Sequence, residues 1–173
     1  LDGNQDGIPG DSWTRTFNAC GEVQLLVDNA ESGVGWSVVN ENVTDGAWDT
    51  SPSVPIGGGL RNDPPTDFDG SGRCFLTDNV AGNSDVDGGP TRLVSRAFDV
   101  TVSPDPYLSF AYWLVTDGSD VMTVDVSSND GTSWTGVTVL QGGTDWSLYT
   151  FRVSDYVTPS AQTRLRFSVA DNP

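Results

Sequence analysis

Apolar and polar residues alternate along most of this chain, in short runs separated by clusters of Gly, Pro and Asp. Alternation with a period of two is typical of β-strands that bury one face. The runs that we predict as strands are 23–27, 36–39, 73–77, 91–100, 107–115, 121–126, 134–140, 146–153 and 164–170. We find no convincing amphipathic helix. This pattern predicts an all-β fold, a two-sheet antiparallel β-sandwich of the jelly-roll type.

Some runs also predict which side chains face the core. The inward positions are Met122, Val124 and Val126 in one run and Leu165, Phe167 and Val169 in another. Run 107–115 is apolar on both faces, so we expect both faces to be largely buried. In run 91–100 the alternation slips near Ser95, as it does at a β-bulge. The turn SNDGTSW, 128–134, resembles a shortened Asp-box, with Asn129, Asp130 and Gly131 expected to adopt positive φ.

Composition narrows the class of protein. The 173 residues suffice for one domain, and 24 acidic against 8 basic residues give a net charge of −16. Asp far outnumbers Glu, and every basic residue is Arg, which favours turns and metal loops over helices. Such a polyanion repels nucleic acid and anionic lipid, and no apolar run approaches the about 20 residues that span a bilayer. We therefore expect no nucleic-acid partner and no membrane insertion, with an acidic linker over 1–12 and a β-sandwich domain over 13–173.

Acidic residues gather most densely between 67 and 87, in DFDGSGRCFLTDNVAGNSDVD. Carboxylates this close repel one another unless a cation neutralises them. Oxygen ligands without His or Met nearby suit calcium better than zinc or copper. The predicted ligands are Asp67, Asp69, Asp78, Asn83, Asp85 and Asp87. Outside this stretch, a salt-adapted secreted surface explains the acidic excess equally well.

The first residues, LDGNQDGIPGDS, form a second candidate calcium loop. Oxygen-bearing side chains alternate before Gly7, as they do in loops of the D-x-N-x-D-G type. Trp13 stands where an EF-hand has its bidentate Glu, so the segment is more similar to the aspartate repeats of thrombospondin type 3 and dockerin-like linkers. A plain flexible linker is the alternative. The candidate ligands are Asp2, Asn4, Asp6 and Asp11.

Cys20 and Cys74 are the only cysteines in the chain. An even pair in a Lys-free, Asp- and Gly-rich chain indicates one disulfide and an oxidising compartment, so we expect a secreted protein. Closing this loop would stabilise the fold by roughly 4 kcal/mol in the chain-entropy model. Two buried free thiols are the alternative. The chain begins at Leu1 without an initiator Met, as a mature fragment would.

Several stretches, at 23–38, 44–49, 63–89, 91–100, 107–113, 124–134 and 163–171, share a pattern with a known family. Together they resemble MAM-like modules of bacterial secreted proteins, which are related to LamG and concanavalin-type jelly rolls. The most specific of these stretches is DPPTDFDGSGRCFLTDNVAGNSDVDGG, residues 63–89. The resemblance implies a non-catalytic two-sheet jelly roll that binds calcium at the loops between 67 and 87.

In that family, a strand such as RLRFSVAD is followed by one final strand. Here the chain stops at Pro173, so the jelly roll is expected to lack its own final strand, either because the chain is trimmed or because a strand arrives from elsewhere. Such a sheet would expose an unpaired edge and an apolar groove. Residues 13–24, WTRTFNACGEVQ, are a candidate strand for this groove or for that of a neighbour. Donation between copies would build a head-to-tail fibre.

Catalysis is not expected. The chain has no His to act as a base, it lacks the ligands of a hydrolytic zinc site, and its carboxylate pairs lie in Gly-rich loops. We predict an extracellular structural or adhesive module stabilised by calcium. The alternative is a carbohydrate-binding module, appended to a secreted enzyme, that binds polysaccharide by stacking on aromatic rings. The candidate stacking residues are Trp36, Trp48, Trp134 and Trp146, and the candidate N-glycosylation site is Asn42 in Asn42-Val43-Thr44.

Overall fold

The computed structural model describes residues 24–57, 62–116 and 119–171. The strands in these ranges are β1 (Ser37–Asn40), β2 (Val43–Asp45), β3 (Asp87–Gly88), β4 (Thr91–Val94), β5 (Tyr107–Tyr112), β6 (Met122–Ser127), β7 (Thr135–Leu140), β8 (Ser147–Arg152) and β9 (Arg164–Val169). A 3-10 turn, η1 (Val153–Asp155), follows β8, and these ranges contain no α-helix. The all-β fold class predicted from the sequence is confirmed. No helix in the described ranges has the length and apolarity to cross a membrane.

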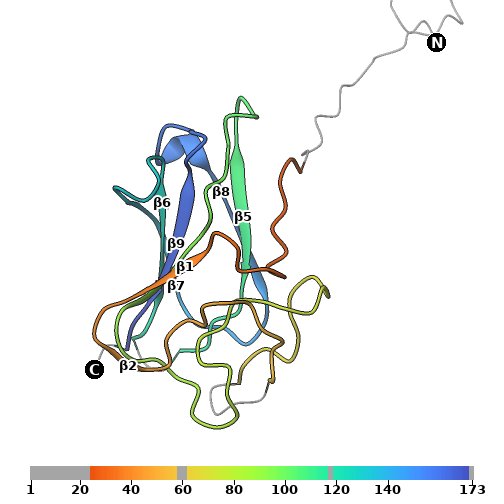
Figure 1. Cartoon of the computed structure of the whole chain (residues 1–173), viewed down its shortest axis with the longest axis vertical. Helices are drawn as coiled ribbons and strands as arrows, with labels where there is room; N and C mark the ends of the chain where they lie inside the picture. Colours follow the sequence, from red (N-terminus) through yellow and green to blue (C-terminus); the bar gives the residue numbers. More distant parts are fainter. Residues whose placement is uncertain (1–23, 58–61, 117–118, 172–173) are drawn as a thin grey trace, which may run out of the picture.

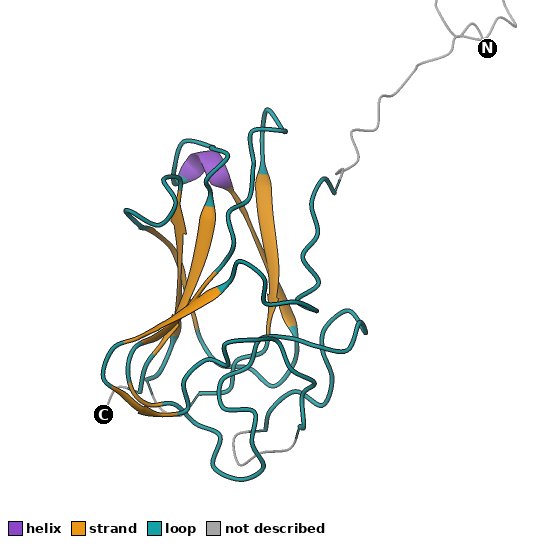
Figure 2. Ribbon diagram, in the orientation of Figure 1, coloured by secondary structure: helices purple, strands orange, loops and turns teal. Residues whose placement is uncertain are grey.

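Two layers of antiparallel strands face one another (Figures 1 and 2). The larger layer is a five-stranded sheet in the order β1-β4-β9-β6-β7, and the facing layer is the pair β5-β8. The small pair β2-β3 joins the long loops that gather at the lower end in Figure 1. Phe110 of β5 meets Phe167 of β9 edge-on, with ring centroids 5.0 Å apart. The hydrophobic core therefore lies between the two layers.

The predicted alternation sets which side chains enter this core. Val124 and Val126 have no exposed surface, and Met122, Leu165 and Phe167 are buried beside them. Val169, also predicted to point inward, is partly buried and packs against the core. β5 differs from the expectation that both of its faces are buried. Its inner residues pack against the core, but Tyr107 is 56% exposed, because no third layer formed by the described residues covers the outer face of β5.

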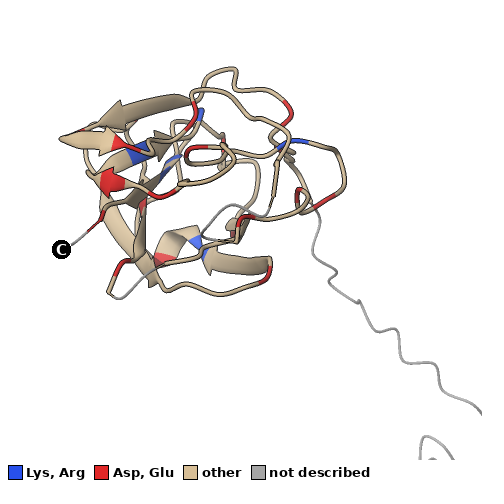
Figure 3. Ribbon diagram, turned by 90° about the horizontal axis from the view of Figure 1, so that it is seen from below, with Lys and Arg blue, Asp and Glu red and all other residues tan. Residues whose placement is uncertain are grey.

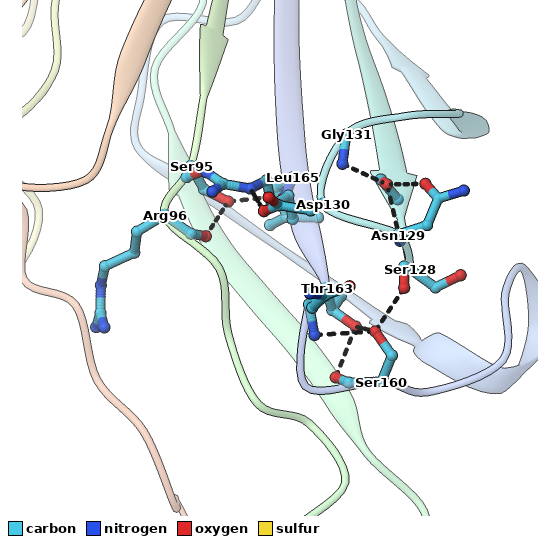
Figure 4. Close-up of polar contacts among 12 residues, drawn as sticks. Ser95, Arg96, Ser128, Asn129, Asp130, Gly131, Ser160, Thr163 and Leu165 are labelled. Carbon is cyan, nitrogen blue, oxygen red and sulfur yellow. Dashed lines mark hydrogen bonds and ion pairs between the residues drawn. The ribbon is translucent and has the colours of Figure 1, made fainter.

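The turn between β6 and β7 is fixed to the loop that precedes β9 (Figure 4). The Ser160 hydroxyl donates a hydrogen bond to the carbonyl oxygen of Ser128 at 2.7 Å. Asp130 and Gly131 have φ of 57° and 83°, as expected for this hairpin turn. The positive φ expected at Asn129 is wrong: Asn129 keeps an ordinary backbone and contributes through its side chain, which makes hydrogen bonds within the turn. The turn is thus a structural element that sets the register of β6 and β7.

Three predicted strands are shortened or missing. Run 91–100 keeps regular pairing only as far as Val94, and the slip predicted near Ser95 lies where the strand ends. Run 73–77 contributes isolated bridges from Cys74 and Thr77 in place of a strand. Residues 24–27, the described part of run 23–27, form no strand. A strand needs a neighbouring edge, and no described strand pairs with 24–27.

We predict that Val124→Ala destabilises the fold by about 2 kcal/mol, because it leaves a cavity where Val124 packs with no exposed surface. Val139→Ala, on the 62%-exposed Val139 of β7, is the matched control and should change the free energy of unfolding by less than about 0.5 kcal/mol. Urea unfolding measures both variants. An equal loss of unfolding free energy in Val124→Ala and Val139→Ala would contradict the placement of the core between the two layers.

Candidate functional site

The acidic stretch 67–87 divides into separate groups in the structure. Asp67 is buried, and its carboxylate accepts hydrogen bonds from the Gly72 amide at 2.9 Å and from the Ser71 hydroxyl. Asp69 is exposed and accepts bonds from the amide and the hydroxyl of Ser71, at 2.9 and 2.6 Å. These bonds, first the one from the Ser71 hydroxyl, lower the pKa of Asp69. This turn therefore stabilises its own two carboxylates with local donors.

Asp78 belongs to a second group. Unlike Asp69, whose pKa is lowered, Asp78 is in surroundings that disfavour its charged form. Its pKa is raised, first by burial and then by the charges of four other aspartates, Asp45, Asp49, Asp63 and Asp85. Gly46 lets its own segment lie close to the backbone of Asp85. Its φ is 69°, and a Cβ at this position would lie 1.9 Å from the carbonyl oxygen of Asp85. Figure 3 shows the acidic positions spread over the loops at this end of the molecule.

The predicted calcium ligands are thus only partly brought together. Asp87 lies in β3, where it pairs with Asp45 of β2, and Asn83 is exposed. The sequence analysis missed Asp45, Asp49 and Asp63, although the turn TDGAWD at 44–49 was a usable signal. Within the described ranges, no three carboxylate, thiol or imidazole groups stand close enough to hold a metal ion. The oxygen donors suit calcium in kind, so calcium binding stays a prediction, and Asp2, Asn4, Asp6 and Asp11 lie outside the described residues.

Cys74 places its thiol among these acidic loops. The side chain is buried, and burial followed by the charges of Asp67 and Glu31 raises the pKa of the thiol to about 12. A thiol with this pKa carries almost no thiolate at neutral pH, so it is a poor nucleophile. Its expected disulfide partner, Cys20, lies outside the described residues, and the disulfide stays a prediction.

A large apolar groove of about 1780 Å³ opens between the two layers. Its floor includes Leu93 and Phe167 of the larger sheet, one wall is β5, and the facing wall is the segment 24–30. In Figure 1 this orange segment runs beside the green β5. The apolar floor and walls offer a surface that can bury the side chains of a polypeptide or another apolar ligand.

The groove follows the backbone edge of β5. Every residue from 103 to 116 lines it without a gap, whereas successive side chains of a strand point to opposite faces. An unbroken run of lining residues therefore means that the groove wraps around the outer edge of the strand. Among the described residues β5 pairs only with β8, on its other edge. The open edge of β5 and the apolar groove together form the candidate functional site.

The four predicted sugar-stacking residues are not gathered on one face. Trp36, Trp48 and Trp146 line the groove, whereas Trp134 lies on the outer face of the larger sheet. Several of the rings already have partners. Trp36 packs on Phe75 at 4.6 Å, and the guanidinium of Arg166 lies 4.5 Å from the ring of Trp134. Their arrangement does not form the flat exposed row that favours a sugar-binding module.

Asn42, the predicted glycosylation site, lies in the turn between β1 and β2. Its side chain is exposed and its φ is 54°, a left-handed conformation that Asn tolerates well. The backbone carbonyl of Asn42 accepts a hydrogen bond from the Gly89 amide at 3.2 Å. The position is accessible to modification, and glycosylation stays a prediction.

No family model, curated protein or solved structure matches this chain. The resemblance to MAM-like modules therefore stays a prediction. The function must be argued from the groove and from the acidic loops themselves.

We predict that Asp78→Asn raises the melting temperature at pH 7 in the presence of a chelator, by about 2 °C. The raised pKa of Asp78 means that the folded protein binds a proton more readily than the unfolded chain, so stability falls as pH rises through that pKa. The variant removes this loss, and its advantage should shrink as the pH is lowered towards 4. Asp145→Asn, at an exposed aspartate outside the group, is the control. Equal melting temperatures of Asp78→Asn and wild type at pH 7 would contradict the raised pKa of Asp78.

Proposed function

We propose that this protein is a non-catalytic, extracellular structural or adhesive module that accepts an extended polypeptide strand in its groove. The strand comes from a second copy, so that copies join head to tail into a fibre. The observation that carries this proposal is the outer edge of β5, which no described strand pairs with, beside an apolar groove. Backbone groups along an open edge supply affinity for an added strand, and pockets for alternate side chains supply specificity.

The exposed apolar surface at the groove favours binding of an added strand. Leu25, Leu26 and Val27 on the wall opposite β5 are each about half exposed. Burying such surface against an added strand contributes roughly 25 cal/mol per Å² removed from water. An edge of this kind, left open, is also a hazard for uncontrolled aggregation, which a specific partner strand prevents.

The described residues offer little for catalysis. The chain contains no His, and the pKa of the Cys74 thiol is about 12. The carboxylate of Asp69 is held by hydrogen bonds from its own turn, which favours the charged form and suits neither a general acid nor a nucleophile. These features support a binding or structural role.

Calcium is part of the proposal as a stabiliser of the acidic loops. The residues that would hold it are drawn from the two groups around Asp67 and Asp78. Bound calcium supplies positive charge that offsets the repulsion among carboxylates. Oxygen donors from turns and the lack of His fit calcium better than a transition metal.

We expect calcium to raise the melting temperature of the full chain, by about 5 to 10 °C at a hundredfold excess over its Kd. Asp78→Asn should reduce this rise, because it removes one donor charge, whereas Asp145→Asn should leave it unchanged. Differential scanning calorimetry with calcium and with EDTA provides the measurement. A melting temperature that EDTA leaves unchanged would show that calcium has no structural role.

Assembly through the groove predicts a matched contrast between two exposed valines. Val27 lines the groove at 60% exposure, and Val139 lies on β7 outside it at 62%. Val27→Asp places a charge in the apolar groove and should raise the concentration needed for assembly by about tenfold or more. Val139→Asp should assemble as the wild type does. Light scattering after size exclusion and electron microscopy measure both, and a wild-type chain that stays monomeric at every concentration would overturn the proposed function.

A further inference from the structure

We infer that the strand that fills the groove is the segment 13–19, WTRTFNA, donated by a second copy of this chain. This inference rests on the proposed function and names the partner of the same site. It is carried by the lining of the groove, by the charge of that lining and by the position of Gln24 at the groove.

β5 and the segment 24–28 both line the groove, and Figure 1 shows the two running beside one another. Asp28 anchors that segment, because its carboxylate accepts hydrogen bonds from Trp36 Nε1 at 3.1 Å and from Arg96 Nε at 2.8 Å. Leu25, Leu26 and Val27 precede this anchor and form no sheet bonds with any described strand. A strand placed between them and β5 would have apolar surface on both sides.

The sequence of 13–19 suits a strand in this groove. Aromatic and β-branched residues favour extended structure, and Trp13, Arg15, Phe17 and Ala19 all fall on the same face of such a strand. That face can point towards the apolar floor, while Thr14 and Thr16 point outward.

Charge complementarity supports the same occupant. Among the described residues, Arg73 is the one base that lines the groove, together with a set of acids. These acids are Asp28, Asp63, Asp69, Asp85, Asp99, Asp105, Asp120 and Asp171. Arg15 is the only basic residue among residues 1–23, and it lies in the middle of the proposed strand. A basic side chain on an apolar strand matches an apolar groove with an acidic lining.

The position of Gln24 favours a second copy as the source. Gln24 already lines the groove, and residues 20–23 would have to reverse the chain for 13–19 to enter the same groove. From a second copy the segment can enter without a turn, since each extended residue spans about 3.3 Å. A contact of this kind joins different surfaces of two copies and therefore propagates as a chain of molecules.

Complementation between two full-length variants tests the inference, under reducing conditions so that Cys20 forms no cross-links. Phe17→Asp disables the proposed donor and keeps the groove, whereas Val27→Asp disables the groove and keeps the donor. Each variant alone should be monomeric. Their equimolar mixture should form a one-to-one dimer that does not grow, because only one productive contact remains. Asn18→Asp, which adds the same charge on the other face of the segment, is the control and should assemble within about threefold of wild type.

The other outcomes separate this inference from the proposed function. If Phe17→Asp assembles as well as wild type while Val27→Asp does not, the groove accepts a strand but 13–19 is not the donor. If wild type is monomeric and Phe17→Asp alone lowers its melting temperature, the segment fills its own groove and the second-copy source is wrong. If wild type is monomeric and Phe17→Asp has no effect, both the inference and the proposed function fail.

Discussion

The packing of the β5-β8 pair onto the five-stranded sheet is the interaction on which the rest of the structure depends. Phe110 and Phe167 meet at the centre of this contact, and the fully buried Val124 and Val126 lie in the sheet beneath it. Apolar side chains from both layers leave water only where the layers overlap. The overlap therefore buries the apolar face that the alternation in the sequence gives each strand.

The two layers are unequal, and the groove is a direct result. Five strands face two, so the inner side of the larger sheet extends past the edge of β5. Segment 24–30 and the acidic loops occupy part of that space without joining a sheet. Their contacts enclose Leu93 and Phe167 but leave no hydrogen-bond partner, among the described residues, for the outer edge of β5. The same interface that creates the core thus leaves an open strand position.

Folding shifts the pKa values of Asp69 and Asp78, which belong to two different groups of carboxylates, in opposite directions. Asp69 obtains its donors from Ser71, two residues away, and its pKa falls. The pKa of Asp78 rises, first through burial and then through the charges of acids from distant parts of the chain. Local turns can place a donor beside each carboxylate, whereas long-range contacts bring like charges together as a consequence of packing. Cation binding at the second group would therefore act on the fold as a whole.

The sequence by itself determined the all-β class, most strand positions and the inward residues of β6 and β9, because side chains alternate strictly along a strand. It also located the β6-β7 turn from SNDGTSW. Only the tertiary structure decided that 24–27 forms no strand, that Asp45, Asp49 and Asp63 join Asp78, and that one edge of β5 stays open among the described residues. Pairing and charge proximity depend on which distant segments meet, and local alternation carries no information about that.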